Sequence, residues 1–213
     1  SSLMISVQGS AAAQHEITGT QSSAQVYPTS DALLHTYMDA SKVPGVANDI
    51  YYRYRRNGEW TKPRVIFHEP ALRGFHPAIS QANDGSVHVV FMSDAVGGQA
   101  IRYTSAGSRA MTWSESTVLH TTSSRFVFPP EVLTDLHGVV HAFWTELDLL
   151  PEREYAVRHY HTSAYDGIWE EPRVLFMDHK GAPMPFKMAM QDNGTIHVAY
   201  GAADGHLYHA QFR

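Results

Sequence analysis

The sequence predicts an all-β protein made of four similar units of short antiparallel strands, and three observations carry this prediction. The segments "DALLHTYM", "GSVHVVFM", "GVVHAFWT" and "GTIHVAYG" align their histidines at spacings of 53, 53 and 56 residues; these are His35, His88, His141 and His197. Trp60, Trp113 and Trp169 repeat at spacings of 53 and 56. Helical periodicity is hard to find, whereas β-branched and aromatic residues alternate with polar ones. A repeat of this length is typical of a four-stranded blade, so we expect a four-bladed β-propeller with antiparallel blades.

Each unit contains four strands, A to D. In the second unit these are "PAISQ" (77–81), "SVHVVF" (86–91), "AIRYTS" (100–105) and "WSESTVL" (113–119). Their β-branched and aromatic side chains suit a pleated, half-buried surface. Turns that need a positive φ separate them, as "NDG" at 83–85 and "DNG" at 192–194 indicate.

Strand D carries the clearest repeated motif. The pattern W-x-x-P-R-V occurs at 60–65 and again at 169–174. We interpret Trp60, Trp113 and Trp169 as residues that pack one blade against the next. The repeated strand B histidines are also interpreted as packing residues, because a side chain present in every blade is typical of a structural position. The same interpretation is preferred for His159 and His161 over a metal site.

The two ends of the chain predict circular closure of a single domain at residues 1–213. We place the blades at about 24–74, 75–125, 126–181 and 182–213. The last unit stops after strand C, while unassigned residues precede the first. A strand from residues 1–23, either "LMISV" or "HEITGT", is expected to complete the last blade. Such closure removes exposed sheet edges.

Composition limits the functional classes. The chain has 213 residues, of which 43% are hydrophobic and 17% charged, with a formal charge of -5. No apolar run is long enough to insert into a membrane, and no basic block indicates nucleic-acid binding. The sequence contains no cysteine, which removes disulfides and thiolate chemistry. We expect no metal or other cofactor. The chain begins without an apolar signal segment, so a signal is expected to be absent or already removed, and a secreted or extracytoplasmic location is slightly favoured.

The order G-x-[VI]-H-V-x-[FYW], [IV]-x-Y and W-x-x-P-x-V-L resembles the repeats of sialidase-like (BNR-repeat) β-propellers from about Gln25 onward. The Asp-box of that family, S-x-D-x-G-x-x-W, is represented by "SAYDGIW" at 163–169, one residue short. The resemblance implies the fold. Sialidases place their arginines and acidic residues on six blades, which four blades cannot supply, so no sialidase site residue is transferred.

Propeller geometry predicts where a ligand binds. The D-to-A and B-to-C connections emerge on one face, and they include the longest loops, at 39–49 and 145–154. Long loops in the first and third blades give the ring of blades approximate twofold symmetry. This arrangement suits an elongated ligand that lies across the channel mouth. The predicted ligand-binding residues are Asp39, Arg73, His76, Arg125, Trp144, Glu146 and His179. Trp144 is expected to be an aromatic platform for a sugar.

A second set is predicted to be catalytic if the protein is an enzyme. Strand C aligns Tyr51, Arg102, Arg158 and Tyr208, and His76 begins a strand A at the channel mouth. Two arginines bind an acidic group bidentately, while histidine and tyrosine exchange protons. The same strand C residues are also explained by packing between blades.

The leading functional hypothesis is a lectin-like propeller that binds a glycan or another small ligand, as a monomer or small homo-oligomer. One alternative is a polysaccharide lyase or glycoside-processing enzyme with His, Tyr and Arg acid–base chemistry. The other is a protein-interaction module. The linear sequence does not separate these three hypotheses, because each of them depends on which side chains lie close together in the folded protein.

Overall fold

The computed structural model describes residues 22–26, 33–38, 49–56, 58–108, 112–124, 126–149, 155–178, 187–191, 193–201 and 206–212. Across these residues the structure has strands and no helix, which confirms the all-β prediction. Neighbouring strands in every sheet are antiparallel. Among the described residues there is accordingly no helix long and apolar enough to cross a membrane.

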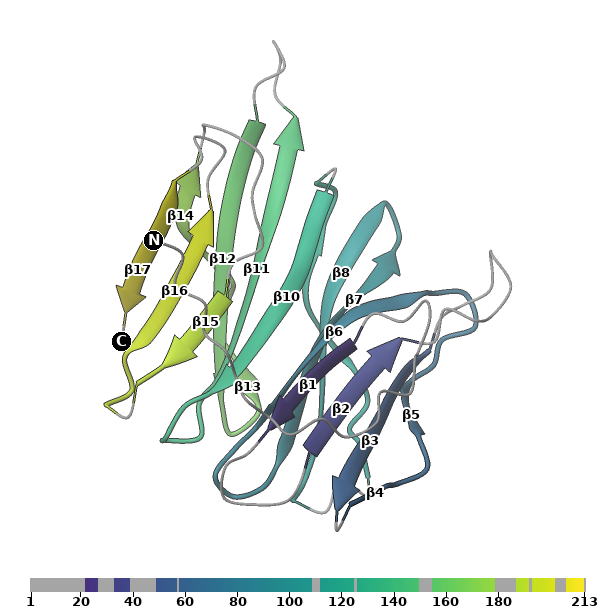
Figure 1. The fold of residues 1–213 in the computed structure, drawn as a ribbon. Helices are drawn as coiled ribbons and strands as arrows, with labels where there is room; N and C mark the ends of the chain where they lie inside the picture. The colour runs from purple at the N-terminus through teal and green to yellow at the C-terminus, as the bar shows by residue number, and fades with distance from the viewer. Residues whose placement is uncertain are drawn as a thin grey trace.

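The strands form four sheets that follow one another along the chain (Figure 1). The first contains β1 (Ser22–Val26), β2 (Leu33–Met38), β3 (Ile50–Arg56), β4 (Glu59–Trp60) and β5 (Arg64–Phe67). The second contains β6 (Gly74–Gln81), β7 (Val87–Ala95), β8 (Gly98–Ala106) and β9 (Thr117–Thr122). The third contains β10 (Phe126–Thr134), β11 (Val140–Leu149), β12 (Tyr155–Tyr165), β13 (Ile168–Trp169) and β14 (Arg173–Asp178), and the fourth β15 (Lys187–Met190), β16 (Ile196–Gly201) and β17 (Leu207–Phe212).

Strand D is divided in the first and third sheets by the W-x-x-P motif. Pro63 and Pro172 lie in the gaps between β4 and β5 and between β13 and β14. Proline has no N–H to donate to a strand ladder, so pairing stops there and resumes on the other side. These two sheets therefore have five short strands where the sequence predicted four.

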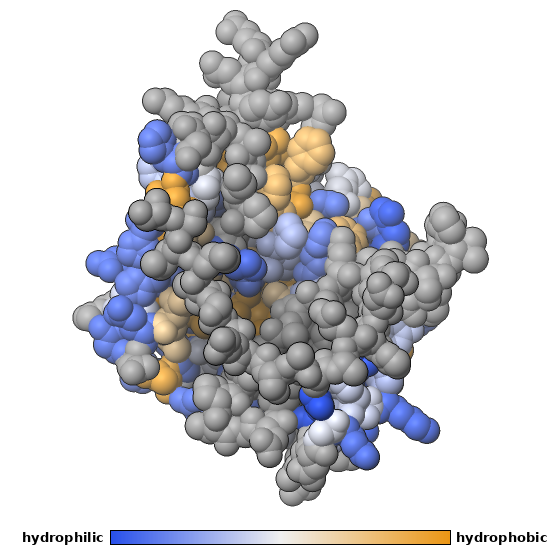
Figure 2. Space-filling model, viewed as in Figure 1, coloured by the Kyte–Doolittle hydropathy of each residue, from blue (hydrophilic) through white to orange (hydrophobic). Residues whose placement is uncertain are grey.

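The first strands of the sheets lie toward one another. Strand β6 contacts β1, β2 and β10, and β10 also contacts β15. Apolar residues from adjacent sheets pack into three clusters, exemplified by Ile50 with Phe91, Met92 with Trp144, and Phe143 with Ile196. In Figure 2, apolar side chains gather mainly in the middle of the described surface, and most hydrophilic ones lie toward its edges. Burial between sheets is therefore the main source of stability.

The strand D tryptophans differ in their packing. Trp113 of the second sheet contacts Tyr52 of the first, with ring centroids 5.0 Å apart, and Trp169 of the third contacts Tyr103 of the second at 4.8 Å. Trp60 belongs to the first sheet and is 38% exposed, with the Arg53 guanidinium 4.4 Å from its ring centroid. The packing interpretation thus describes the second and third tryptophans better than the first.

The strand B histidines contact strand C. His88, His141 and His197 pair in register with Ser105, Ser163 and Gln211. Each ring reaches the residue two positions earlier on strand C, and these neighbours are Tyr103, His161 and His209. Such diagonal pairs on one sheet face are packing contacts. His35 pairs in register with Arg53.

The predicted closure of the ring falls outside the described residues. "LMISV" and "HEITGT" both belong to the undescribed part of the chain, and β1 pairs with β2 of the first sheet. In the described residues the fourth sheet has three strands, with β17 at its edge.

Candidate functional site

The connections between neighbouring sheets meet the ends of strands B and C at one end of the molecule, which we call the loop face. Its described segments are 67–74, 94–99, 122–124 with residue 126, and 146–149. Arg73, before β6, contacts Asp94 at the end of β7, and Thr122, at the end of β9, contacts Glu146 near the end of β11. The D-to-A and B-to-C connections therefore share this face, as propeller geometry predicts.

Arg73 and Asp94 form a bidentate ion pair on this face. Arg73 Nε donates to Asp94 Oδ2 at 2.7 Å and Nη2 donates to Oδ1 at 3.0 Å. The hydrogen bond from Arg73 lowers the pKa of Asp94, and the same bond raises the pKa of Arg73. The predicted ligand residue Arg73 thus has its charge matched within the protein. Because the pair is partly exposed, it orients the two groups more than it stabilises the fold.

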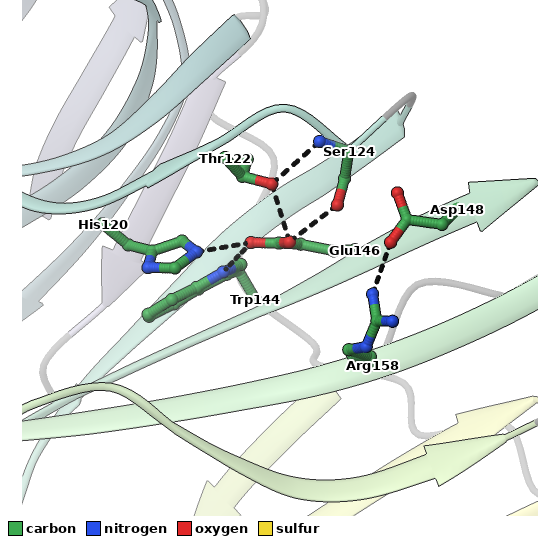
Figure 3. A network of polar contacts seen from close by, with 7 residues as sticks. All are labelled: His120, Thr122, Ser124, Trp144, Glu146, Asp148 and Arg158. Atoms are coloured by element: carbon green, nitrogen blue, oxygen red, sulfur yellow. Dashed lines mark hydrogen bonds and ion pairs between the residues drawn. The ribbon is translucent and has the colours of Figure 1, made fainter.

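A buried carboxylate organises the seam between the second and third sheets (Figure 3). Glu146 is 2% exposed. Its Oε2 accepts hydrogen bonds from Thr122 Oγ1 at 2.8 Å and Ser124 Oγ at 2.9 Å. Its Oε1 accepts from Trp144 Nε1 at 3.0 Å and lies 3.1 Å from His120 Nε2. Four protein groups therefore satisfy this carboxylate.

These contacts determine the charge of Glu146. Burial acts to raise its pKa, but the hydrogen bonds from His120, Thr122, Trp144 and Ser124 outweigh burial and lower it. Glu146 is thus ionised at neutral pH. The prediction that Glu146 binds ligand directly is wrong for this structure, because the side chain is covered and its oxygens are bonded to protein groups.

The prediction that Trp144 is a sugar platform is also wrong. Its side chain is fully buried, at 0% exposure, so no ligand can reach the ring. The indole stacks on Tyr160 at an interplanar angle of 2° and a centroid distance of 5.4 Å. The His120 ring lies at the same centroid distance, 5.4 Å, and is tilted by 35°. A buried indole needs a partner for its N–H, which Glu146 supplies.

Beside this buried core the seam carries half-exposed polar groups. Asp148 and Glu146 lie on the same face of β11, two residues apart, and Arg158 pairs with Glu146 across the ladder. Arg158 Nη1 donates to Asp148 Oδ2, and both side chains are 30% exposed. Tyr160, next along the same face of β12, has its pKa raised, chiefly by burial and then by the Glu146 charge. Figure 3 shows Arg158 and Asp148 beside the Glu146 network.

His76 has an unusual backbone conformation. Its φ is 51°, in the left-handed region that residues other than glycine rarely adopt. It lies in a bulge of β6, where the register shifts between Phe75 and Ala78. Burial lowers the pKa of its half-buried ring, which is therefore neutral at pH 7. Strain of this kind is frequent at functional sites, and the bulge aims the side chain away from the regular pleat.

The predicted strand C set is not in register. In each sheet the strand C residue that pairs with the strand B histidine serves as the reference position. Arg102 and Tyr208 are equivalent, because each lies three residues before this reference position in its own sheet. The equivalent residue of the third sheet is Tyr160, whereas Arg158 lies two residues earlier on that strand. In the first sheet Tyr51 lies two before the paired residue, which places it on the opposite sheet face. The structure therefore does not align these four side chains.

Each of these residues has a local partner. Arg102 donates to Ser93 Oγ at 2.9 Å and to Ser116 Oγ at 3.1 Å. Tyr51 donates to Asp49 at 3.4 Å. Tyr208 stacks on Tyr200 with centroids 5.5 Å apart. These hydrogen bonds and ring contacts are local to one sheet, whereas the packing interpretation predicted contacts between blades. Arg102 does make such a contact, because its guanidinium lies 5.4 Å from the ring centroid of Phe67 in the first sheet.

Three predicted ligand residues, Asp39, Arg125 and His179, lie outside the described residues. In the part of the chain that the structure describes, no three His, Asp or Glu side chains are close enough to hold a metal ion.

Sequence reasoning missed His120. It lies within β9, strand D of the second sheet. Strand D of the first sheet is followed by His68, whose Nδ1 lies 2.7 Å from Asp49 Oδ1. The recurrence of histidine after "VIF" and "TVL", in "VIFH" and "TVLH", was the available signal. In both places the imidazole contacts a buried carboxylate, a pairing that orients the ring.

Known structures share this fold. A Hadza microbial sialidase superposes with a TM-score of 0.63 at 13% identity, covering 85% of this chain and 42% of that chain. The α-L-arabinanase of Penicillium chrysogenum, complexed with arabinobiose, gives 0.59 at 14% identity, covering 84% of this chain and 56% of that one. The Trypanosoma rangeli sialidase, in complex with the inhibitor DANA, gives 0.55 at 6%, covering 84% and 34%.

These similarities confirm the sialidase-like fold predicted from the repeats. No family model and no curated protein matches the chain. The chain spans less than two thirds of the length of each of the three proteins. At these identities the likeness establishes the fold and not the activity.

Proposed function

We propose that this protein binds a glycan on the loop face, at the seam between the second and third sheets. The observation that carries the proposal is the partly exposed Arg158–Asp148 pair, which lies beside the buried Glu146 on a sheet face that also carries Tyr160, itself in contact with His120. A sugar hydroxyl both donates and accepts hydrogen bonds, so a guanidinium beside a carboxylate matches it. The sialidase and arabinanase neighbours, which act on carbohydrates, support this ligand class.

The charge arrangement favours a neutral glycan. Arg158 is paired with Asp148, and Arg73 with Asp94. Each pair cancels its own charge while its groups remain partly exposed. The described loop face therefore offers hydrogen-bond donors and acceptors without the unpaired positive charge that would select a uronate or a sulfate.

Replacing Arg158 with alanine is expected to weaken glycan binding at least tenfold, because the substitution removes a donor and leaves Asp148 without its partner. Binding of neutral oligosaccharides to the immobilised protein measures this effect. Arg173→Ala is the matched control, since Arg173 is exposed at the start of β14, away from the seam. Equal affinity of Arg158→Ala and the wild type, with both folded, would contradict the proposed site.

The alternative is a glycan-processing enzyme, which one specific observation favours. His120 Nε2 lies 3.1 Å from the buried Glu146 carboxylate, and the Tyr160 ring lies 5.2 Å from the imidazole. A histidine oriented by a buried carboxylate is the arrangement of a general base.

The enzyme alternative predicts that incubation changes the mass of a glycan and that a folded His120→Gln variant abolishes this change. His206→Gln, at an exposed histidine just before β17, is the control. Mass change that persists in His120→Gln would assign the chemistry to other residues.

We also propose that four blades close into a ring through an N-terminal strand. The fourth sheet has three strands in the described residues, whereas the others have four or more. Its edge strand β17 exposes Leu207 at 79% and Tyr208 at 40%. Pairing of a further strand with β17 would cover this edge and give the last sheet the strand count of the second.

A further inference from the structure

The end of the sheets opposite the loop face, which we call the turn face, carries a cavity. Its walls are the tight turns at 82–86, 135–139 and 165–168, and its volume is about 390 Å³. The lining includes Asp84, His88, Tyr103, His137 and Tyr165. This volume lies in the range of small-molecule sites. None of the residues discussed above for the loop face lines it.

The walls of the cavity are held in place by their own hydrogen bonds. Asp84 Oδ1 accepts from the Ser86 N–H at 2.8 Å, and Asp135 Oδ1 accepts from the N–H groups of His137 and Val139, both at 2.8 Å. Gly85 adopts a φ of 86°, which these turns require. The cavity is therefore preformed, and a ligand does not have to order it.

A directional chain of hydrogen bonds forms its floor. The Ser86 hydroxyl donates to Asp84 at 2.6 Å, so its oxygen accepts from His88 Nε2 at 3.0 Å. His88 Nδ1, 2.8 Å from the Tyr103 hydroxyl, is then the acceptor of the Tyr103 O–H. Burial lowers the pKa of His88, which is consistent with a neutral ring of fixed tautomer. The chain ends on the Asp84 carboxylate, which is left to accept further hydrogen bonds.

The rim of the cavity supplies the aromatic surface that Trp144 does not. Tyr165 is 61% exposed and Leu136 47% exposed at its edge. An exposed tyrosine ring beside carboxylate acceptors is complementary to a sugar, which has an apolar C–H face and donating hydroxyls. Of the described residues that line the cavity, none is a lysine or an arginine, while Asp84 and Asp166 are acidic, so these residues disfavour an anionic ligand.

We infer that the turn face holds a second, independent binding site for one uncharged sugar residue, with Tyr165 as the stacking platform and Asp84 as a hydrogen-bond acceptor. Two sites at opposite ends of one rigid fold would let the protein engage two glycan segments at once, which raises the avidity for a branched or multivalent glycan. The inference does not require the loop face to bind.

The test is a titration of the ¹⁵N-labelled full chain with methyl glycosides of glucose, galactose, mannose and N-acetylglucosamine, read from the amide signals of Gly85, Gly138 and Gly167. At least one glycoside is expected to shift these signals in a saturable manner. Tyr165→Ala is expected to weaken the interaction at least tenfold, and Asp84→Asn to weaken it as well. Tyr208→Ala, at another partly exposed tyrosine, should match the wild type.

Arg158→Ala separates the two proposals, because it lies on the loop face and should leave the Gly85, Gly138 and Gly167 shifts unchanged. Absence of any shift with all four glycosides would overturn the inference. Shifts confined to loop-face amides would do the same, as would binding of equal strength in a folded Tyr165→Ala variant. Loss of loop-face binding alone, with the turn-face shifts retained, would count against the proposed function and support the second site.

Discussion

Replacing Glu146 with alanine is expected to lower the free energy of unfolding by about 3–5 kcal/mol. The substitution leaves the donors of His120, Thr122, Ser124 and Trp144 without their acceptor inside a covered seam, and buried donors without partners are costly. Equilibrium unfolding in urea at pH 7 measures the change. Because Glu146 joins β9 and the β9–β10 connection to β11, the loss should also loosen the second sheet from the third.

Asp148→Ala is the matched control for this experiment. Asp148 lies two residues further along the same face of β11, is 30% exposed and pairs with Arg158 (Figure 3). Its removal is expected to cost at most about 1 kcal/mol, as for other exposed ion pairs. Similar losses in the two variants would mean that Glu146 does not organise the seam.

Acid is expected to destabilise the protein well above the pH at which carboxylates protonate, and His161 should dominate this effect. Burial, then the charges of His141 and Arg173, lower the pKa of His161 from 6.5 to about 3. In the unfolded chain the same imidazole takes up a proton below pH 6.5, so the unfolded state binds more protons and stability falls as the pH falls. The contribution is complete above pH 6.5 and is lost progressively toward pH 3. This single group should remove ~3 kcal/mol between pH 6.5 and pH 4.

Burial also lowers the pKa values of His76, His88 and His141, so these groups act in the same direction. The measurement is the free energy of unfolding across pH 4 to 8. His161→Gln cannot take up the proton and should flatten this curve, while His206→Gln, at an exposed position, should leave its slope unchanged. An unaltered slope in His161→Gln would show that the acid sensitivity has another origin.

The strands were predictable from the sequence because their signals are local. Alternation in "SVHVVF" and "TIHVAY" and the Asn-Gly and Asp-Gly turns identify β7, β16 and their hairpins. Register across strand C was not predictable in this way. Arg158 pairs with Glu146, which lies five residues after the strand B histidine His141. Arg102 pairs with Phe91, which lies only three residues after His88, so the two arginines are not at equivalent positions. Strand lengths and bulges therefore separate residues that a linear alignment places together.

The candidate site depended on packing between sheets, which the sequence does not display. Trp144 stands where strand B of the second and fourth sheets has Phe91 and Tyr200, and this departure suggested a binding residue, yet its side chain is fully buried among residues of the second and third sheets. Glu146 lies in a segment whose length indicates an exposed loop, but β11 extends through it and buries it. His120 had a weak signal in the recurrence of histidine after strand D. Tyr165 had none, because its turn, "YDG", looked like a simple hairpin connection.

The measurement that tests the central proposal most directly is incubation of the pure full chain with an array of neutral, acidic and sulfated glycans, read for retained protein and for glycan mass together. We predict retention on neutral glycans without a change of mass, with retention reduced in Arg158→Ala and preserved in Arg173→Ala. A change of mass would support the His120 alternative instead. Retention on no glycan, with all masses unchanged, would contradict the proposal that this fold serves glycan recognition.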